Sequence, residues 1–259
     1  MTPAKIISPA RTLPAPDVGL FSTKYGIRTV VSPTRVQILS LLSKTELPFD
    51  EIVKKMDKAK STVSIHLRGL EQAGIIGGKT DPNDSRRKIF FFRSQFIGGL
   101  ATKKPVICDD NNEFLTRQVS DTDPFRFYRL MFRTIRVSLL TEGINIDPVL
   151  RKAGCDVGER VYPVISAPDL ASFLKKTAKF WKTNSLGLIK IESMAPLVLV
   201  VYDCFECGSL PQLGRPACAF DSGILEAVFS RHFKKRQQVT ETACFAMGDD
   251  HCRFVIVPA

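Results

Sequence analysis

The stretch STVSIHLRGLEQAGII, residues 61–76, decides how the N-terminal part of this chain folds. Val63, Leu67 and Leu70 recur at helical spacing and predict one buried helix face. Gly74 stands where a helix commonly ends in the left-handed conformation, and two isoleucines then begin a strand. The stretch therefore predicts a helix, a sharp stop and a strand, in that order.

Two more helices are predicted upstream of this stretch, and a hairpin is predicted downstream. Pro33 opens the first helix with Ser32 as its N-cap. Its apolar positions, which form a buried face, are Val36, Ile38, Leu39, Leu41 and Leu42. After the Leu47-Pro48 turn, the second helix carries Phe49, Ile52, Val53 and Met56 at helical spacing. A turn at residues 81–85 and a returning strand at 88–92 complete a two-stranded wing.

Basic and hydroxyl side chains gather at the start of the third helix and at the base of the hairpin. Small hydroxyls and lysines at a helix start can approach phosphates and base edges, and arginines on a hairpin can neutralise phosphates. Each residue alone is equally well explained as a solvated surface side chain, and His66 as a structural histidine. Their joint placement favours DNA binding by Lys58, Lys60, Ser61, Thr62, Ser64, His66, Arg68, Arg86, Arg87 and Lys88.

The composition agrees with a nucleic-acid partner. The 259-residue chain carries a net charge of +11, which favours polyanions: nucleic acid first and an anionic membrane second. The longest apolar run, residues 195–202, has the length of a strand and not of a membrane span. The N-terminus lacks the apolar core of a signal peptide. We therefore expect a cytoplasmic protein without a membrane partner.

The pattern predicts an α+β chain in four parts. These are an N-terminal tail (1–24), a DNA-binding domain (25–93), a connector (94–124) and a C-terminal cysteine-rich domain (125–259). In the last part helices are expected at 126–141, 169–183 and 216–233, and strands at 188–192, 196–202, 238–242 and 253–257.

Five of the seven cysteines fall between Cys204 and Cys252. In a reducing compartment such a cluster is more often metal-binding or redox-active than a set of structural disulfides. One group is the Cys204-x-x-Cys207 motif directly after a strand. The second group is Cys218, Glu241, Cys244 and Cys252, in which a polar turn at 247–251 can bring the last two cysteines together.

The N-terminal order of helix, helix, turn, helix and basic wing resembles the winged-helix regulators of the arsenic-repressor type. The residues that carry the resemblance are those of the opening stretch and the hairpin. The resemblance implies that the third helix enters the major groove of double-stranded DNA and that the hairpin lies along the backbone or minor groove.

A second resemblance covers the C-terminal half. The segments YDCFECGSLPQLGRPACAFDSGILEAVF and ETACFAMGDDHCRFVIV look like the vinyl-4-reductase sensor domain, a small-molecule-binding α+β domain. In its aromatic-sensing members a zinc ion is held by three cysteines and a glutamate. Carried over by position, the ligands here are Cys218, Glu241, Cys244 and Cys252, which are a suitable tetrahedral zinc shell.

A winged helix joined to this domain resembles the redox-responsive regulators of methanogenic archaea. The resemblance implies a homodimer, control of oxidative-stress genes and a thiol switch, with zinc either structural or coupled to redox state. The four-ligand shell leaves out Cys204 and Cys207, which makes them the candidate redox pair, with thiols available to an oxidant. Packing cysteines are the alternative. Cys108 is a candidate for an intersubunit disulfide, and Cys155 for an inert buried thiol.

Two other functions remain open at this point. The C-terminal domain could sense a small aromatic or apolar ligand in a pocket lined by Phe127, Phe180 and Trp181, with zinc purely structural. An enzyme is disfavoured because the chain has no Gly-rich dinucleotide loop, no Gly-x-Ser-x-Gly and no His-Glu-x-x-His, so no catalytic residue is assigned.

Overall fold

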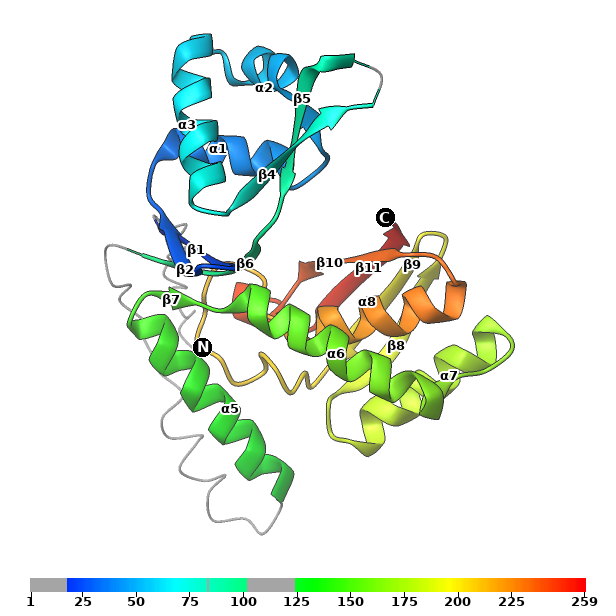
Figure 1. The fold of residues 1–259 in the computed structure, drawn as a ribbon. Helices are drawn as coiled ribbons and strands as arrows, with labels where there is room; N and C mark the ends of the chain where they lie inside the picture. The colour runs from blue at the N-terminus through cyan, green and yellow to red at the C-terminus, as the bar shows by residue number, and fades with distance from the viewer. Residues whose placement is uncertain (1–17, 83, 102–123) are drawn as a thin grey trace, which may run out of the picture. The chain divides into compact units, whose positions relative to one another are not determined.

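The computed structural model describes residues 18–82, 84–101 and 124–259, and these divide into two compact units (Figure 1). The N-terminal unit contains the described residues from 18 to 101 together with 143–146. The C-terminal unit contains 124–142 and 147–259. Each unit has a hydrophobic core of its own.

The N-terminal unit contains the expected winged helix. Its elements are α1 (Pro33–Leu42), β3 (Leu47–Pro48), α2 (Phe49–Met56), α3 (Lys60–Gln72), β4 (Ile76–Asp81) and β5 (Asp84–Phe92). The sheet order is β3-β5-β4, with both pairs antiparallel. The predicted order of three helices and a two-stranded wing is confirmed.

Helical spacing identified most of this core. The expected face of α3, formed by Val63, Leu67 and Leu70, is buried. Gly74 has φ +74°, and a Cβ there would lie 2.9 Å from the Tyr25 ring, so both conformation and space require glycine. Val36 is a correction, because its side chain is 46% exposed on α1.

Two strands of the N-terminal unit lie outside the bounds expected for the DNA-binding domain. A second antiparallel sheet has the order β2-β1-β6-β7, formed by Val18–Thr23 (β1), Gly26–Val30 (β2), Gln95–Leu100 (β6) and Ile144–Asn145 (β7). β1 lies in the expected tail and β6 in the expected connector. Their pairing joins segments more than 70 residues apart, which no local pattern indicates. Phe21 of β1 is buried in the same core as α1 and α3.

The C-terminal unit is a four-stranded antiparallel sheet with helices. The sheet order is β10-β11-β9-β8, from Gln237–Ala243 (β10), Cys252–Pro258 (β11), Leu197–Tyr202 (β9) and Leu188–Met194 (β8). The helices are α5 (Pro124–Thr141), α6 (Asp147–Ile165), α7 (Leu170–Thr183) and α8 (Ala219–Phe233). Among the helices in the described part of the chain, none has both the length and the apolar character that crossing a membrane requires.

α6 was not expected from the sequence, because it contains two glycines and, at Pro163, a proline in its interior, which are poor helix formers. It lies beside the buried helix α8 (Figure 1). A Cβ on Gly154 would lie 2.1 Å from the Phe220 carbonyl oxygen, and one on Gly223 would lie 2.1 Å from the Arg151 carbonyl oxygen. The glycines therefore allow the two helix backbones to touch.

We expect Gly154→Ala to lower the free energy of unfolding by about 1–2 kcal/mol. Alanine favours a helix by about 1 kcal/mol over glycine. Here the new methyl group would collide with backbone of α8, and such overpacking costs about 1–3 kcal/mol. Urea unfolding followed by the fluorescence of Trp181, the one tryptophan of the chain, measures the change. Val164→Ala, at an exposed position of α6, is the control. Equal stability of the two variants would contradict the close packing.

Candidate metal centre and nucleic-acid interface

The residues predicted to bind DNA lie at the start of α3 and on β5. Lys58, Lys60, Ser61 and Arg68 are exposed. The side chains of Thr62, Ser64 and His66 are partly buried. Because the opposite face of α3 is buried in the core, the helix presents a polar and basic face to the outside.

The wing places its basic residues beside acidic ones. The guanidinium of Arg87 donates to Asp50 at 3.0 Å, and the ammonium of Lys88 donates to Glu71 at 2.8 Å. Arg86 is exposed. A concavity of about 650 Å³ lies between these residues and α3, lined by Phe49, Asp50, Ser64, Asp84, Arg86, Arg87, Lys88 and Phe90. Contact of Arg87 or Lys88 with a phosphate therefore requires exchange of an ion pair.

Sequence reasoning missed Ile65. Its side chain is 65% exposed on α3, between Ser61 and Arg68 along the same helix face. An apolar side chain on a helix that enters the major groove can contact a thymine methyl group. The signal was available, because residues 61, 65 and 68 follow helical spacing away from the buried positions.

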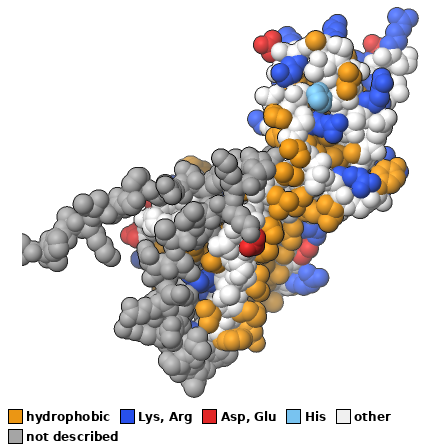
Figure 2. All heavy atoms as spheres, turned by 90° about the vertical axis from the view of Figure 1, so that its left-hand side faces the viewer, with side chains coloured by type: hydrophobic (Ala, Val, Ile, Leu, Met, Phe, Trp, Pro, Cys, Tyr) orange, Lys and Arg blue, Asp and Glu red, His pale blue; other side chains and the backbone are white. Residues whose placement is uncertain are grey.

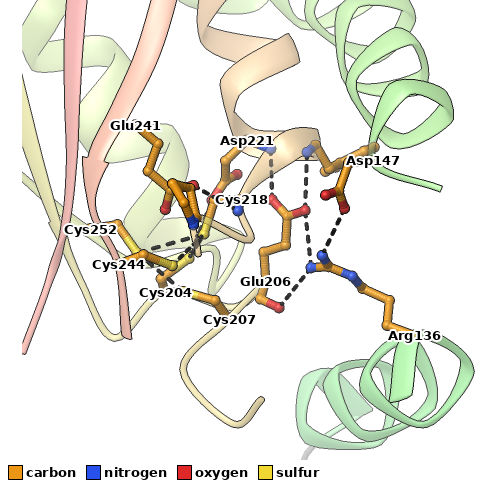
Figure 3. A network of polar contacts seen from close by, with 12 residues as sticks. Arg136, Asp147, Cys204, Glu206, Cys207, Cys218, Asp221, Glu241, Cys244 and Cys252 are labelled. Carbon is orange, nitrogen blue, oxygen red and sulfur yellow. Dashed lines mark hydrogen bonds and ion pairs between the residues drawn. The ribbon is translucent and has the colours of Figure 1, made fainter. Parts of the chain in front are cut away.

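The five C-terminal cysteines converge at one place in the C-terminal unit (Figure 3). We call them, together with Glu241, the cysteine cluster: Cys204, Cys207, Cys218, Glu241, Cys244 and Cys252. All five sulfur-bearing side chains are buried. Two four-ligand sets that can hold a metal ion are present, Cys204–Cys207–Cys218–Cys252 and Cys218–Glu241–Cys244–Cys252. In each set the ligand atoms all lie within 4.8 Å of one another.

The sulfur atoms are in direct contact. Cys218 Sγ lies 3.6 Å from Cys204 Sγ, 3.6 Å from Cys252 Sγ and 3.9 Å from Cys244 Sγ. Cys207 Sγ lies 3.1 Å from Cys252 Sγ. Cys218 and Cys252 are thus the members that both four-ligand sets share.

This arrangement corrects the division into a metal shell and a separate thiol pair. Cys204 and Cys207 contact the other cysteines and are fully buried, so they are not thiols open to solvent. The expected availability of this pair to an oxidant is therefore wrong for the structure as it stands. A linear sequence does not show that the loop after β9 folds back onto the start of α8.

Local turns position the cluster. Cys244 follows the last residue of β10 and Cys252 begins β11, and the turn between them contains Gly248 at φ +100°. The Asp249 carboxylate accepts a hydrogen bond from the Cys244 amide at 2.8 Å, which closes the turn. Cys218 is the residue before α8. The cluster therefore collects side chains from a loop, a helix start and two paired strands.

Glu241 has one satisfied and one unsatisfied carboxylate oxygen. Its Oε2 accepts from the Cys218 amide at 2.8 Å, while its buried Oε1 has no hydrogen-bond partner in the described structure. Burial, and secondly the charge of Cys244, raises the pKa of Glu241 to about 9. A metal ion would bind this oxygen only after the proton has left, so metal binding releases protons.

The thiols also shift each other's ionisation. Hydrogen bonds from neighbouring thiols, Cys207 first, lower the pKa of Cys204 and of Cys244. Burial raises the pKa of Cys218, and the hydrogen bond with Cys204 raises that of Cys207. The contacts within the cluster thus favour the thiolate form at Cys204 and Cys244, and thiolates are the form that binds metals and reacts with oxidants.

Glu206, between the two cysteines of the loop, ties the cluster to α8 and α5 (Figure 3). Its carboxylate accepts hydrogen bonds from the amides of Phe220 and Asp221 in the first turn of α8, at 3.0 and 2.9 Å. It also pairs at 3.3 Å with Arg136 of α5, whose side chain is 2% exposed. Burial raises the pKa of Glu206 to about 8, and Arg136 opposes the rise. Asp147 completes the network by pairing with Arg136 and Arg215.

Other expected residues lie elsewhere. Cys155 is a free, half-buried thiol on α6, so the expectation of a fully buried one is wrong. Cys108 lies outside the described residues. Phe127 is 60% exposed on α5 whereas Trp181 is fully buried in the core, so these two do not share the environment that a common ligand pocket requires.

Fold and site together define a DNA-binding regulator with a sensor domain. Residues 32–77 match the family described as bacterial regulatory protein, arsR family, and residues 197–258 match the vinyl-4-reductase domain family. The chain therefore carries an ArsR-family helix-turn-helix domain at its N-terminus and a vinyl-4-reductase domain at its C-terminus, as the sequence predicted.

The chain is also similar to proteins of Methanocaldococcus jannaschii, two of which are uncharacterized. The uncharacterized protein MJ0150 is 24% identical over 128 residues, which are 49% of this chain and 73% of that protein. The uncharacterized protein MJ1642 is 34% identical over 82 residues, or 32% of this chain and 51% of that protein, so only about half of its length is matched. The crystal structure of a vinyl-4-reductase family protein from the same organism aligns with a TM-score of 0.37 and 18% identity, over 57% of this chain and 88% of the other.

We expect Glu206→Ala to destabilise the chain by about 3 kcal/mol or more. The substitution leaves the buried Arg136 guanidinium and two buried amides without their main partner, and breaking a buried pair from one side costs about 3–5 kcal/mol. Urea unfolding with Trp181 fluorescence gives the value. The control is Asp156→Ala, which breaks the exposed pair with Lys152 and should change stability by less than about 0.5 kcal/mol. Similar losses in both variants would show that the Glu206 network is not a structural link.

Proposed function

We propose that the chain is a redox-responsive transcriptional regulator of the cytoplasm, acting on double-stranded DNA and not as an enzyme. The observation that carries the proposal is the convergence of five buried cysteines in the vinyl-4-reductase domain of a chain with an ArsR-family DNA-binding domain. Clustered thiolates respond to oxidants, and a winged helix supplies the output. The response would serve defence against oxidative stress.

DNA binding in this proposal follows the exposed face of α3. The helix enters the major groove, and the basic residues of the wing contact the backbone. Figure 2 shows Lys and Arg side chains distributed over the N-terminal unit at the top of the view. These charges would supply sequence-independent affinity, whereas Ile65 and Arg68, both exposed on α3, would contact base edges.

The regulator would act as a homodimer on two half-sites about one helical turn apart. The support is an exposed apolar face on α5, formed by Phe127, Tyr128, Met131 and Ile135. These residues follow helical spacing, and hydrophobic side chains are exposed on the face of the molecule that Figure 2 shows. Contiguous apolar surface of this kind is typical of an interface.

We expect Ile65→Ala to weaken binding to an operator selected from random DNA about tenfold and to leave non-specific binding unchanged. Loss of an apolar base contact removes discrimination, worth about 1–3 kcal/mol for a good contact, but no charge. Lys60→Ala should weaken both operator binding and non-specific binding. It should also reduce the slope of log affinity against log salt concentration by about 1. Fluorescence anisotropy at several salt concentrations measures both, and footprinting tests for two half-sites.

The control for Ile65→Ala is Val36→Ala, which also removes exposed apolar atoms from a helix of the same unit. Equal operator affinity in wild type and Ile65→Ala would contradict the proposal that this face of α3 contacts the bases of the operator.

The second four-ligand set would hold zinc. Cys218, Glu241, Cys244 and Cys252 supply three thiolates and one carboxylate, which suits a tetrahedral Zn²⁺ ion. The free Oε1 of Glu241 supports this, because a buried carboxylate oxygen without a partner is unfavourable unless a ligand satisfies it. When bound, zinc would supply folding energy by joining the start of α8 to the β10–β11 turn.

Cys204 and Cys207 would carry the redox response. Oxidation by a peroxide removes two electrons and two protons from the two thiols and leaves a disulfide, while the peroxide is reduced to water. Cys207 also lies 3.1 Å from Cys252, so this thiol has a second partner within reach. Because these side chains are buried, reaction requires the loop at 204–210 to open first.

We expect operator affinity to change at least tenfold between dithiothreitol and peroxide, and this response to disappear in Cys207→Ser. Serine cannot form a disulfide, so the loop of the variant has the same covalent structure in dithiothreitol and in peroxide. Anisotropy under both conditions is the measurement, with mass spectrometry to identify the bonded cysteines. Cys155→Ser, outside the cluster, should respond like wild type. An operator affinity that is the same in both conditions for wild type would exclude the redox function.

A further inference from the structure

The cysteine cluster offers six ligands where one tetrahedral ion takes four. The two four-ligand sets overlap in Cys218 and Cys252. Cys204 and Cys207 belong only to the first set, and Glu241 and Cys244 only to the second. A single ion therefore leaves two potential ligands unused on one side of the shared pair.

Three of the sulfur–sulfur distances in the cluster are close to the edge of a zinc–thiolate tetrahedron. A zinc–sulfur bond of about 2.3 Å gives a tetrahedron with edges of about 3.8 Å. The shared edge, Cys218 Sγ to Cys252 Sγ, is 3.6 Å. Cys218 also lies 3.6 Å from Cys204, which only the first set contains, and 3.9 Å from Cys244, which only the second set contains. The Cys207–Cys252 contact of 3.1 Å is shorter and must open by several tenths of an ångström to receive an ion.

If all six ligands ionise, their charge matches two dications better than one. With all six ligands ionised the cluster carries six negative charges in a region where every sulfur is buried. One dication would leave four of these charges uncompensated and two dications would leave two. Because buried charge without a partner is unfavourable, full ionisation of the cluster is compatible with two ions far more than with one.

The surroundings already hold the ligands on both sides in place. On the first side, the Asp221 carboxylate lies 3.4 Å from Cys204 Sγ, and its second oxygen, also buried, has no partner in the described structure. On the second side, backbone amides hold Glu241 and the start of the Cys244 turn. Outer contacts of this kind orient metal ligands.

We propose that Cys204 and Cys207 complete a second metal position, so that the vinyl-4-reductase domain holds two zinc ions bridged by the thiolates of Cys218 and Cys252. One ion has Cys204 and Cys207 as terminal ligands, and the other has Glu241 and Cys244. The proposal rests on the proposed function for the second of these positions. It adds the first position and assigns Cys218 and Cys252 as bridging ligands.

Metal stoichiometry of the full chain tests the proposal. The protein is purified reduced and without oxygen, loaded with zinc, freed of excess metal and measured by mass spectrometry of the metal against amino-acid analysis. We expect two zinc ions per chain. Cys204→Ser/Cys207→Ser and Glu241→Gln/Cys244→Ser should each retain one ion, and Cys155→Ser should retain two.

Cobalt tests the bridge in the wild-type chain and so does not depend on how any variant folds. Two Co²⁺ ions joined by thiolates couple their spins, so the paramagnetic signal should grow with the first equivalent and fall with the second. A signal that grows in proportion to both equivalents would overturn the bridged arrangement.

The outcomes separate this inference from the proposed function. One zinc ion in wild type that survives Cys204→Ser/Cys207→Ser would overturn the second position and keep the four-ligand zinc site. One ion that is lost in that variant and kept in Glu241→Gln/Cys244→Ser would overturn both assignments, since the ion would then occupy the all-cysteine set. No bound zinc in wild type would also overturn both.

Discussion

The contact between five buried thiol sulfurs is the constraint on which the C-terminal unit depends. Thiols that touch share protons and charge, and a buried group of this kind is stable only with a partner ion or with a fixed pattern of protonation. The surrounding elements meet this requirement from several directions. β9 leads into the loop with Cys204 and Cys207, and Cys218 directly precedes α8. Glu241 lies on β10, Cys244 follows that strand and Cys252 begins β11.

Glu206 extends this constraint to the helices. It lies within the Cys-x-x-Cys loop. Its carboxylate accepts hydrogen bonds from two amides in the first turn of α8 and pairs with Arg136 of α5. Two further arginines on the same face of α5 hold the loop, because Arg129 pairs with Asp203 at 2.9 Å and Arg133 donates to the Ser209 carbonyl at 2.6 Å. Three arginines of α5 thus contact the segment that carries Cys204 and Cys207 directly. Another face of α5 exposes apolar side chains.

The N-terminal unit is organised by packing and not by buried charge. Its ion pairs lie at the surface, where Lys88 with Glu71 and Arg87 with Asp50 remain partly exposed. Such pairs contribute little to stability and can be exchanged for phosphate contacts. The two units thus contain different kinds of chemistry: exchangeable charges around α3 and the wing, and a closed set of thiols in the vinyl-4-reductase domain.

Local patterns were sufficient for the helices and the wing of the first unit. The buried face of α3, with Val63, Leu67 and Leu70, and the end of the helix before Gly74 depend on residues close together in the chain. The sequence alone therefore predicted both. The second four-ligand set was implied by the resemblance to the vinyl-4-reductase domain, and metal binding by it stays a prediction. α6 was missed because its glycines, which weaken a helix locally, are explained only by contact with α8.

Tertiary structure alone decided which residues share a site. β1 pairs with β6 across more than 70 residues, and Cys207 meets Cys252 across 45. Glu206 and Ile65 gained their importance only from a buried partner and from an exposed position, respectively. The physical reason is that helices and turns depend on residues near in the chain, whereas metal shells, ion pairs and sheet partners depend on atoms that are near only after the chain has folded.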